Sequence, residues 1–365
     1  MSTTNLLLDV NPNDLLALTA ALVDIPSISK EEKLITDYIE EYISIIRPSA
    51  NVIRINNSVI VQLNHDKNEE LPVIFAGHSD TVPPASSGDS ANPSRVDGDK
   101  LYGLGTSDMK SGLAIMLRLL HNINEKSTFI FYEGEEISDE FNGLCFLSEN
   151  NPELLKGKWA ILLEPTDGNL EMGCQGSLNA NISFKGIAAH SARPHLGDNA
   201  IYKSMDTLNK IKTQSENLEI LEVDSLSYTE SLQITVLHAG NATNVLPDNL
   251  TFNLNYRYQP SKTKEAAIGF ISDLCKDADV IDIYDVLEGA MPAFDHPLID
   301  LAKSKNIDIL AKVAWTDVAR FYALSVPALN CGPGLVEMCH RADEHTSITL
   351  LDSTYNLLNE LVNAD

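Results

Sequence analysis

The amino-acid sequence predicts an α/β fold, with a mixed, mostly parallel sheet, helices on both of its faces and an inserted α+β domain. Three apolar runs, each bounded by turn residues, have the pattern of buried parallel strands and are accompanied by segments with helical periodicity. Beyond residue 177 the pattern changes to strands in which apolar and polar residues alternate. Such alternation is typical of a sheet with one exposed face.

Helices and short strands are expected at the start of the chain. Residues 11–47 predict two helices, and Asn13 or Asp14 can cap the first. Short strands should follow at 52–55 and 59–63.

The three apolar runs all end in polar side chains. The first run is followed by His78, the second by Glu135 and Glu136, and the third by Glu164. Because ligands bind beyond the carboxyl ends of parallel strands, we expect these four side chains to converge on one edge of the sheet. The runs are 72–77, 128–132 and 159–163, and the Ser-, Gly- and Pro-rich segment 84–99 after the first is predicted to be an exposed loop.

The region after residue 177 follows the order β-α-β-β-α-β, which is that of the ferredoxin-like split βαβ motif. We therefore expect a first domain in two parts, 1–177 and 289–365, with a second domain inserted at 178–288. The predicted elements of the insertion are 179–184, 197–213, 232–237, 250–258, 266–275 and 280–287.

Composition excludes several classes of protein. The chain has 26 Lys and Arg against 52 Asp and Glu, a formal net charge of −26, so no nucleic-acid partner is expected. No apolar run approaches the roughly 20 residues of a membrane span, and the first 14 residues lack the pattern of a signal peptide. Five scattered cysteines without a CxxC pair fit a reducing compartment, so we expect a cytoplasmic location.

A glycine-rich stretch, residues 102–112, leads into a predicted helix at 110–122. The stretch invites comparison with a dinucleotide-binding loop, but Asp108 stands where the third glycine should be, and its carboxylate would repel a pyrophosphate. A carboxylate at this junction can instead offer one oxygen to each of two metal ions. The alternative is that Asp108 only caps the helix.

The candidate metal ligands combine imidazole with carboxylates, a set that suits zinc and related divalent ions. Five ligands are too many for one tetrahedral ion with an open position. They suit two ions about 3.5–4 Å apart that share a carboxylate and a water. The set is His78, Asp108, Glu136, Glu164 and a late histidine, either His340 or His345.

Glu135 and Glu136 are adjacent, so they cannot both point to one place from regular backbone. We assign Glu136 as a ligand and Glu135 as the general base, because a carboxylate beside metal-activated water can take its proton. Asp80, two residues after His78, is close enough to accept the second imidazole N–H and fix its tautomer. A solvated acidic loop at 133–136 is the alternative.

Several of these stretches resemble the di-zinc amidohydrolase family, which includes aminoacylases, carboxypeptidases, acetylornithine deacetylases and succinyl-diaminopimelate desuccinylases. The similarity runs through nearly the whole chain. The motifs are 77–83 (Gly-His-Ser-Asp-Thr-Val-Pro), 102–112, Glu135-Glu136 and Glu164-Pro165-Thr166. Segments 164–168, 173–177, 189–194, 244–247 and 253–258 resemble the actinobacterial type of desuccinylase in particular.

The resemblance implies a zinc-exopeptidase-like fold with two Zn²⁺ ions, for which Co²⁺ can substitute. One ion would take His78 and Glu164, the other Glu136 and His340, with Asp108 and a water bridging. The Gly332-Pro333-Gly334 loop upstream favours His340 over His345 and over the neighbouring Cys339. A cis peptide bond after Asp108 is also implied.

The resemblance further implies that the inserted domain serves for dimerisation and as a lid. His190 would come from the partner subunit of a homodimer and stabilise the tetrahedral oxyanion. Asn244 is expected to line the substrate pocket. Arginine suits bidentate binding of carboxylates, and the expected clamps are Arg193, Arg257 and Arg320, although a salt bridge remains an equal alternative for Arg320.

We therefore expect metal-dependent hydrolysis of a small molecule, N-succinyl-LL-2,6-diaminopimelate, to succinate and LL-2,6-diaminopimelate, a step of lysine and cell-wall biosynthesis. No membrane partner is expected. Within the family, the alternative is an acetylornithine deacetylase, another N-acyl-amino-acid amidohydrolase or a dipeptidase. Outside it, the alternative is a non-catalytic homologue that only binds metal or peptide.

Overall fold

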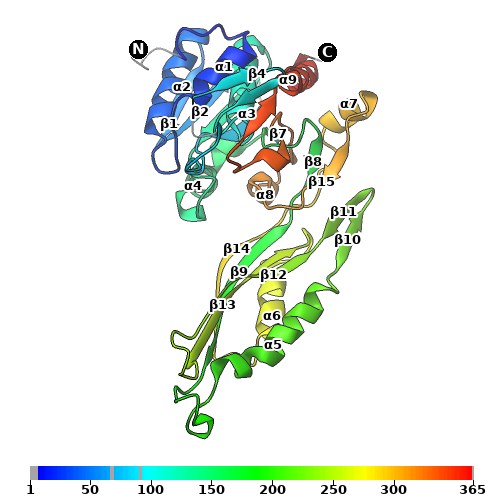
Figure 1. Ribbon diagram of the computed structural model, residues 1–365. Helices are drawn as coiled ribbons and strands as arrows, with labels where there is room; N and C mark the ends of the chain where they lie inside the picture. The colour runs from blue at the N-terminus through cyan, green and yellow to red at the C-terminus, as the bar shows by residue number, and fades with distance from the viewer. Residues whose placement is uncertain (1–6, 66–69, 90–92, 364–365) are drawn as a thin grey trace. The chain divides into compact units, whose positions relative to one another are not determined.

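The computed structural model describes residues 7–65, 70–89 and 93–363, and the chain divides into two compact units (Figure 1). The first unit comprises 1–172, 292–310 and 320–365. The second comprises 173–291 and 311–319. The insertion expected at 178–288 lies inside the second unit, which the stretch 311–319 also joins.

An eight-stranded mixed sheet forms the centre of the first unit. Its strands are β1 (Asn51–Ile55), β2 (Ser58–Leu63), β3 (Val73–His78), β6 (Ser127–Tyr132), β7 (Trp159–Leu162), β8 (Leu170–Met172), β15 (Ile309–Ala311) and β16 (Ala328–Asn330). They lie in the order β1-β2-β6-β3-β7-β16-β8-β15. The run β6-β3-β7-β16 is parallel, whereas β1–β2, β2–β6 and β16–β8 are antiparallel pairs. This arrangement confirms the predicted fold class.

The central strands read as continuous apolar runs because both of their faces are covered. Every residue of β3, β6 and β7 is buried. Across these strands Phe75 stacks on Phe129 at 5.2 Å between ring centroids and meets Trp159 edge-on at 6.1 Å. Aromatic and β-branched packing of this kind removes the polar–apolar alternation that marks a half-exposed strand.

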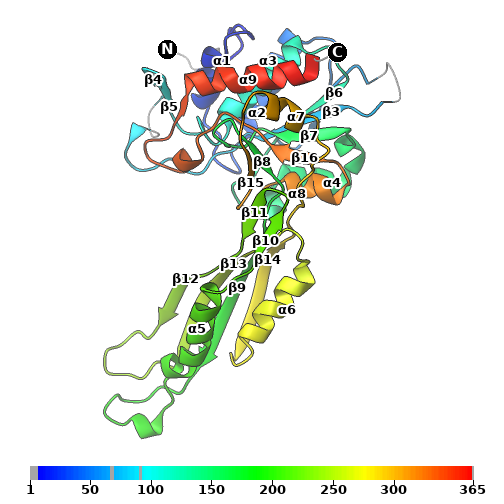
Figure 2. The same cartoon turned by 90° about the vertical axis from the view of Figure 1, so that its right-hand side faces the viewer.

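The helices predicted within 11–47 and at 110–122 are present, and others accompany them. α1 (Leu15–Val23), α3 (Lys110–Asn122) and α9 (Ile348–Asn363) pack against one another, and α3 also packs on β3 and β6. Figure 2 shows these three helices together on one side of the sheet, with α4 (Gly143–Asn150) on the other. The remaining helices are α2 (Lys33–Ile46), α7 (Leu298–Ser304) and α8 (Val318–Ala323). Among the described residues, none of the helices combines the length and apolar character that a membrane crossing requires.

The segment 84–99 differs from its prediction as a loop. It contains β4 (Arg95–Asp97), which pairs with β5 (Lys100–Tyr102), and β5 pairs in turn with β17 (His345–Ser347). All three residues of β4 are exposed, so no apolar pattern marked the strand. Residues 90–92 of the predicted loop lie outside the described residues.

The second unit is a four-stranded antiparallel sheet with two helices. The sheet order is β12-β13-β9-β14, which confirms the ferredoxin-like arrangement. A hairpin, β10–β11, stands outside this sheet and was not predicted. The elements are β9 (Gly176–Lys185), α5 (Ala200–Ser215), β10 (Ile220–Val223), β11 (Leu226–Thr229), β12 (Ser231–Ala239), β13 (Asn249–Tyr258), α6 (Lys264–Leu274) and β14 (Val280–Leu287).

Candidate metal centre

Three neighbouring strands end at the candidate site. β3 lies between β6 and β7 and is parallel to both. His78 is the last residue of β3, Glu164 follows β7, and Glu135 and Glu136 follow β6 after a turn at Gly134. Gly134 has a φ of +71°, and a Cβ there would lie 2.2 Å from a backbone carbonyl oxygen, so the turn requires glycine.

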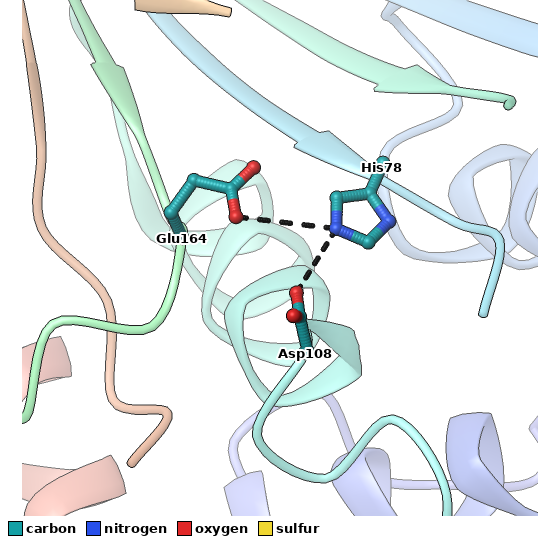
Figure 3. Close-up of side chains that lie close together, drawn as sticks. All are labelled: His78, Asp108 and Glu164. Carbon is teal, nitrogen blue, oxygen red and sulfur yellow. Dashed lines mark hydrogen bonds and ion pairs between the residues drawn. The ribbon is translucent and has the colours of Figure 1, made fainter. Parts of the chain in front are cut away.

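The first group of ligand-type atoms is formed by His78, Asp108 and Glu164 (Figure 3). The Nε2 atom of His78 lies 3.2 Å from Oδ1 of Asp108 and 4.0 Å from Oε2 of Glu164. The His78 ring is fully buried, and the carboxylate-bearing side chains are 15% and 7% exposed. Asp108 reaches the group from the loop that precedes α3.

The second group is formed by Asp108, Glu136 and His340. The Nε2 atom of His340 lies 3.0 Å from Oε2 of Glu136 and 3.5 Å from Oδ2 of Asp108. The two oxygens of Asp108 therefore face different groups, Oδ1 toward His78 and Oδ2 toward His340. This is the arrangement of a carboxylate that bridges two cations.

The spacing of these atoms fits metal coordination. Four ligands that surround one ion tetrahedrally at about 2.1 Å are separated from one another by about 3.4 Å. The contacts within the two groups span 3.0–4.0 Å. Imidazole nitrogen and carboxylate oxygen are also the donor types that divalent zinc prefers.

The electrostatics of the site favour positive charge. Burial lowers the pKa of His78, but the carboxylates of Asp108, Asp80 and Glu164 together outweigh burial, so that the pKa lies well above its usual value. Hydrogen bonds to Asp108 and Glu136 raise the pKa of His340 to about 10. Burial raises the pKa of Asp108, but His340 and His78 outweigh it and bring the pKa below its usual range. Carboxylates that hold protons on neighbouring imidazoles this strongly will also attract a metal cation.

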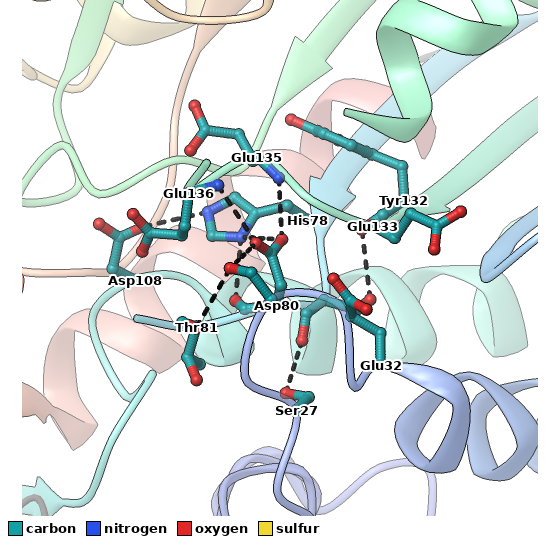
Figure 4. A network of polar contacts seen from close by, with 12 residues as sticks. Ser27, Glu32, His78, Asp80, Thr81, Asp108, Tyr132, Glu133, Glu135 and Glu136 are labelled. Carbon is teal, nitrogen blue, oxygen red and sulfur yellow. Dashed lines mark hydrogen bonds and ion pairs between the residues drawn. The ribbon is translucent and has the colours of Figure 1, made fainter. Parts of the chain in front are cut away.

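Asp80 supports the site from behind the ligands (Figure 4). The Nδ1 atom of His78 lies 3.1 Å from the Asp80 carbonyl oxygen and 3.4 Å from its Oδ1. Both atoms are acceptors, so Nδ1 carries a proton, and Nε2 is the nitrogen that faces Asp108 and that would bind a cation after losing its own proton. Asp80 also accepts the backbone N–H groups of Glu135, at 3.0 Å, and Glu136, at 3.1 Å. One carboxylate thus orients a histidine and fixes the turn that carries the two glutamates.

Glu135 and Glu136 leave this turn in different directions. Figure 4 shows the Glu136 side chain directed toward Asp108, whereas that of Glu135 points away from Asp80. Only Glu136 belongs to one of the two ligand groups found among the described residues.

Two residues near the site were missed from the sequence. Ser29 donates its hydroxyl hydrogen to Oδ2 of Asp80 at 2.7 Å. Glu344 is buried and accepts the backbone N–H groups of Gly105, Ser107 and Asp108, and burial raises its pKa to about 7. Neither position stands out by periodicity, although Glu344 follows the candidate ligand segment closely.

The late histidines occupy different surroundings. His340 lies in the second ligand group, whereas the ring of His345 packs on Tyr102 at 4.9 Å and its Nδ1 lies 2.9 Å from the carbonyl oxygen of Asp343. The Sγ atom of Cys339 donates to the carbonyl oxygen of Leu335 at 3.6 Å and also interacts with Asp108, but Cys339 belongs to neither ligand group among the described residues. The peptide bond between Asp108 and Met109 is cis, as the family resemblance implied.

In the second unit, three expected site residues lie on adjoining loops. His190 forms a bridge with Val245, and the N–H of Ser191 donates to the carbonyl oxygen of Asn244 at 2.9 Å. The N–H of Arg193 donates to the carbonyl oxygen of His190 at 2.7 Å. The structure therefore brings His190, Arg193 and Asn244 together on one exposed surface.

The two remaining arginines lie elsewhere. Arg257 is near the end of β13, the opposite end from Asn244, and its Nε donates to Asn255 at 3.3 Å. Burial lowers its pKa. Arg320, in the first unit, forms an ion pair with Asp139 of the short helix Asp139–Phe141. Such a salt bridge is the alternative that the sequence left open to binding of a substrate carboxylate by Arg320.

Known proteins resemble this chain over nearly its whole length. Residues 172–282 match the peptidase dimerisation domain of M20 type. The chain is 37% identical over 362 residues to the succinyl-diaminopimelate desuccinylase of Corynebacterium glutamicum, with 95% of each chain covered. It is 26% identical over 377 residues to that of Ehrlichia canis, with 94% and 95% covered.

Solved structures share the fold at low sequence identity. A tripeptidase from Staphylococcus aureus matches with a TM-score of 0.80 and 20% identity over 97% of this chain and 98% of its own. A dinuclear metal binding peptidase of the M20 family from Bacillus subtilis matches with a TM-score of 0.69 and 16% identity, covering 95% and 96%. The chain therefore belongs to the M20 peptidase family and, within it, to the succinyl-diaminopimelate desuccinylase group.

Proposed function

We propose that this chain is a metal-dependent amidohydrolase that converts N-succinyl-LL-2,6-diaminopimelate and water to succinate and LL-2,6-diaminopimelate. The observation that carries the reaction is the pair of ligand groups that share Asp108, with Glu135 next to the ligand-type Glu136. The 37% identity to a desuccinylase over nearly the whole chain supports the substrate.

The proposed cofactors are two Zn²⁺ ions, for which Co²⁺ can substitute. The donor set supports this choice, because it combines imidazoles with carboxylates at spacings that fit divalent ions. Such ions, when bound, lower the pKa of a coordinated water to roughly 7 and polarise a carbonyl oxygen. The proposed holders are His78 and Glu164 for one ion, Glu136 and His340 for the other, and Asp108 for both.

The protein's own residues then handle protons and orientation. Glu135 takes a proton from the attacking water as the new C–O bond forms at the succinyl amide carbonyl. It passes this proton to the amide nitrogen as the C–N bond breaks, so that the amine leaves uncharged; the proton of the new carboxyl group then gives succinate and the ammonium form of the amine. Asp80 keeps the Nδ1–H of His78 in place and holds the backbone of Glu135 and Glu136.

His190 is proposed to stabilise the oxyanion. Its Nδ1 accepts the N–H of Ala192 at 3.1 Å, which leaves the proton on Nε2 as a donor. A donor placed where negative charge develops lowers the barrier of acyl transfer. We propose that this histidine acts in the site of the partner subunit of a homodimer, and that the second unit moves as a lid.

A homodimer is supported by the surface of the second unit. β12 is an edge strand of its sheet and exposes Val236 and Leu237, and α5 exposes Tyr202 and Met205. Unpaired edges and exposed apolar side chains are typical of surfaces that bind another chain. Light scattering at micromolar concentration should give twice the monomer mass, and a monomer that remains active would remove the role of His190 in trans.

The substrate carries several carboxylates, and the proposed clamps are Arg193, Arg257 and Arg320, with Asn244 in the pocket; Arg320 would have to give up its ion pair with Asp139 to bind a carboxylate. Arginine binds carboxylates through two parallel hydrogen bonds. We also propose a reducing, cytoplasmic location, which the five free cysteines support.

The proposed activity is tested with a substrate panel on zinc-loaded protein. We expect the highest kcat/KM for N-succinyl-LL-2,6-diaminopimelate. A higher kcat/KM for N-acetylornithine would instead favour the alternative, an acetylornithine deacetylase. The chain is 24% identical, over 80% of its length, to the acetylornithine deacetylase of Aliivibrio salmonicida. If the loaded protein hydrolysed no N-acyl amino acid or dipeptide, the non-catalytic alternative would stand.

A further inference from the structure

The bridging role of Asp108 depends on the loop that carries it. Asp108 must direct Oδ1 to one ligand group and Oδ2 to the other, although it sits at the end of an irregular segment, residues 103–108. A rigid acceptor lies behind this segment. The carboxylate of Glu344 accepts the N–H of Ser107 at 2.9 Å and that of Asp108 at 3.2 Å through Oε1, and the N–H of Gly105 at 3.0 Å through Oε2.

These three bonds define the backbone of the loop. Glu344 is only 1% exposed, so its oxygens have little access to water. Buried backbone N–H groups need an acceptor, and here a single carboxylate accepts three of these groups. Because the N–H of Asp108 is itself one of the three, the bond fixes the orientation of the residue whose side chain bridges the ligand groups.

Glu344 also connects Asp108 with the other loop ligand. It lies four residues after His340, and its own carbonyl oxygen accepts the N–H of Gly103 at 3.1 Å. Next to it, Ser107 donates its hydroxyl hydrogen to the carbonyl oxygen of His345 at 2.8 Å. The segments 103–108 and 340–345 therefore hold each other, and each presents one ligand-type side chain to the same cation position.

We propose that Glu344 is a positioning residue of the metal centre. Its carboxylate holds the loop so that one oxygen of Asp108 faces each of the two cation positions. The proposal rests on the metal site of the proposed function and is independent of the substrate. Glu344 does not act as a ligand, because each of its oxygens is directed to backbone N–H groups and the ligand groups among the described residues do not include it.

The test compares Glu344→Gln with a matched control. Glutamine keeps the shape of the side chain but places an NH₂ group against at least one backbone N–H. The NH₂ group is a donor, so this N–H loses its hydrogen-bond acceptor. Glu337→Gln makes the same replacement at an exposed position of the short helix Val336–Met338, three residues before His340. Metal-free proteins are titrated with Co²⁺, and binding constants, stoichiometry and the visible absorption spectrum are recorded, with circular dichroism as a check of folding.

We expect Glu344→Gln to weaken Co²⁺ binding at both positions by about 10- to 100-fold and to change the absorption spectrum, since Asp108 is shared. Glu337→Gln should match the wild-type protein. If Glu344→Gln does not fold, the same titration is made on Glu344→Asp, which keeps the carboxylate but has a side chain shorter by one methylene group.

One result would overturn the proposal, namely a folded Glu344 variant that binds two Co²⁺ ions with wild-type affinity and spectrum. If the metal-free form of that variant were also less stable to heat, Glu344 would be a purely structural residue. A wild-type protein that binds fewer than two ions would instead contradict the proposed metal centre itself.

Discussion

Replacing Asp80 by asparagine should weaken one cation position more than the other. The carboxylate has four neighbours, namely Ser29 and the N–H of Glu136 on Oδ2, and the N–H of Glu135 and Nδ1 of His78 on Oδ1. Asparagine has only one acceptor oxygen. The arrangement that loses least keeps this oxygen at the Oδ1 position and turns the NH₂ group toward the hydroxyl of Ser29, which can accept it.

In that arrangement the N–H of Glu136 loses its acceptor. The loss of a hydrogen bond to a charged partner costs about 1.5–3 kcal/mol. Since about 1.4 kcal/mol corresponds to a factor of ten in a binding constant, the cation held by Glu136 should bind about 10- to 100-fold more weakly. The cation held by His78 should be affected less, because the contact to Oδ1 and the 3.1 Å contact to the backbone carbonyl both remain.

The measurement is a titration of metal-free Asp80→Asn with Zn²⁺ in competition with a chromophoric chelator, fitted to two binding steps, together with kcat. Ser29→Ala is the matched control, because it removes one donor from Oδ2 and leaves both backbone N–H groups bonded. Its effect should be the smaller of the two. An Asp80→Asn protein with two wild-type binding constants and wild-type kcat would refute the reasoning.

Three further results are expected. Glu135→Gln should bind both cations with wild-type affinity and lose kcat by about 10²–10⁴-fold, because only the proton acceptor is removed; unchanged turnover would refute the base assignment. His190→Ala should lower kcat by about 10²–10³-fold with intact metal content, because it removes an oxyanion donor. Steady-state kinetics that showed a change in KM alone would contradict this role. Burial lowers the pKa of His296 to about 3, and its Nδ1 accepts the N–H of Leu298. Between pH 6.5 and pH 3 the His296 ring is therefore neutral in the folded protein but protonated in the unfolded protein. Stability should therefore fall as the pH drops from 6.5 toward 3, by roughly 2 kcal/mol at pH 5, and thermal unfolding of His296→Gln should lack this component.

The strand-borne part of the site was predictable for a physical reason. A parallel strand covered on both faces has little room for polar residues, so the position where polar side chains begin marks its end. His78, Glu135, Glu136 and Glu164 all follow such runs. The structure confirms that the three strands are parallel neighbours, which is what brings their ends to one edge.

The supporting contacts were not predictable in the same way. Glu344 and Asp108 are 236 residues apart, and a hydrogen bond between a side chain and a distant backbone N–H leaves no periodic pattern in either segment. The hairpin β10–β11 is different, because its sequence does carry a signal. Leu226 and Tyr228 are buried between exposed neighbours, and Asp224 in the turn has a φ of +51°, as hairpin turns prefer.

The two proposed cation positions differ in what holds their candidate ligands. His78 and Glu164 come from the ends of adjacent buried strands, so the sheet itself sets their separation. Glu136 and His340 come from loops, and His340 has a φ of +62°, a left-handed conformation that costs free energy for a residue with a Cβ. Such a conformation persists only where the surrounding contacts determine it. The anchored segment around Glu344 meets that requirement, which explains why a buried carboxylate with no ligand role lies so close to the candidate metal centre.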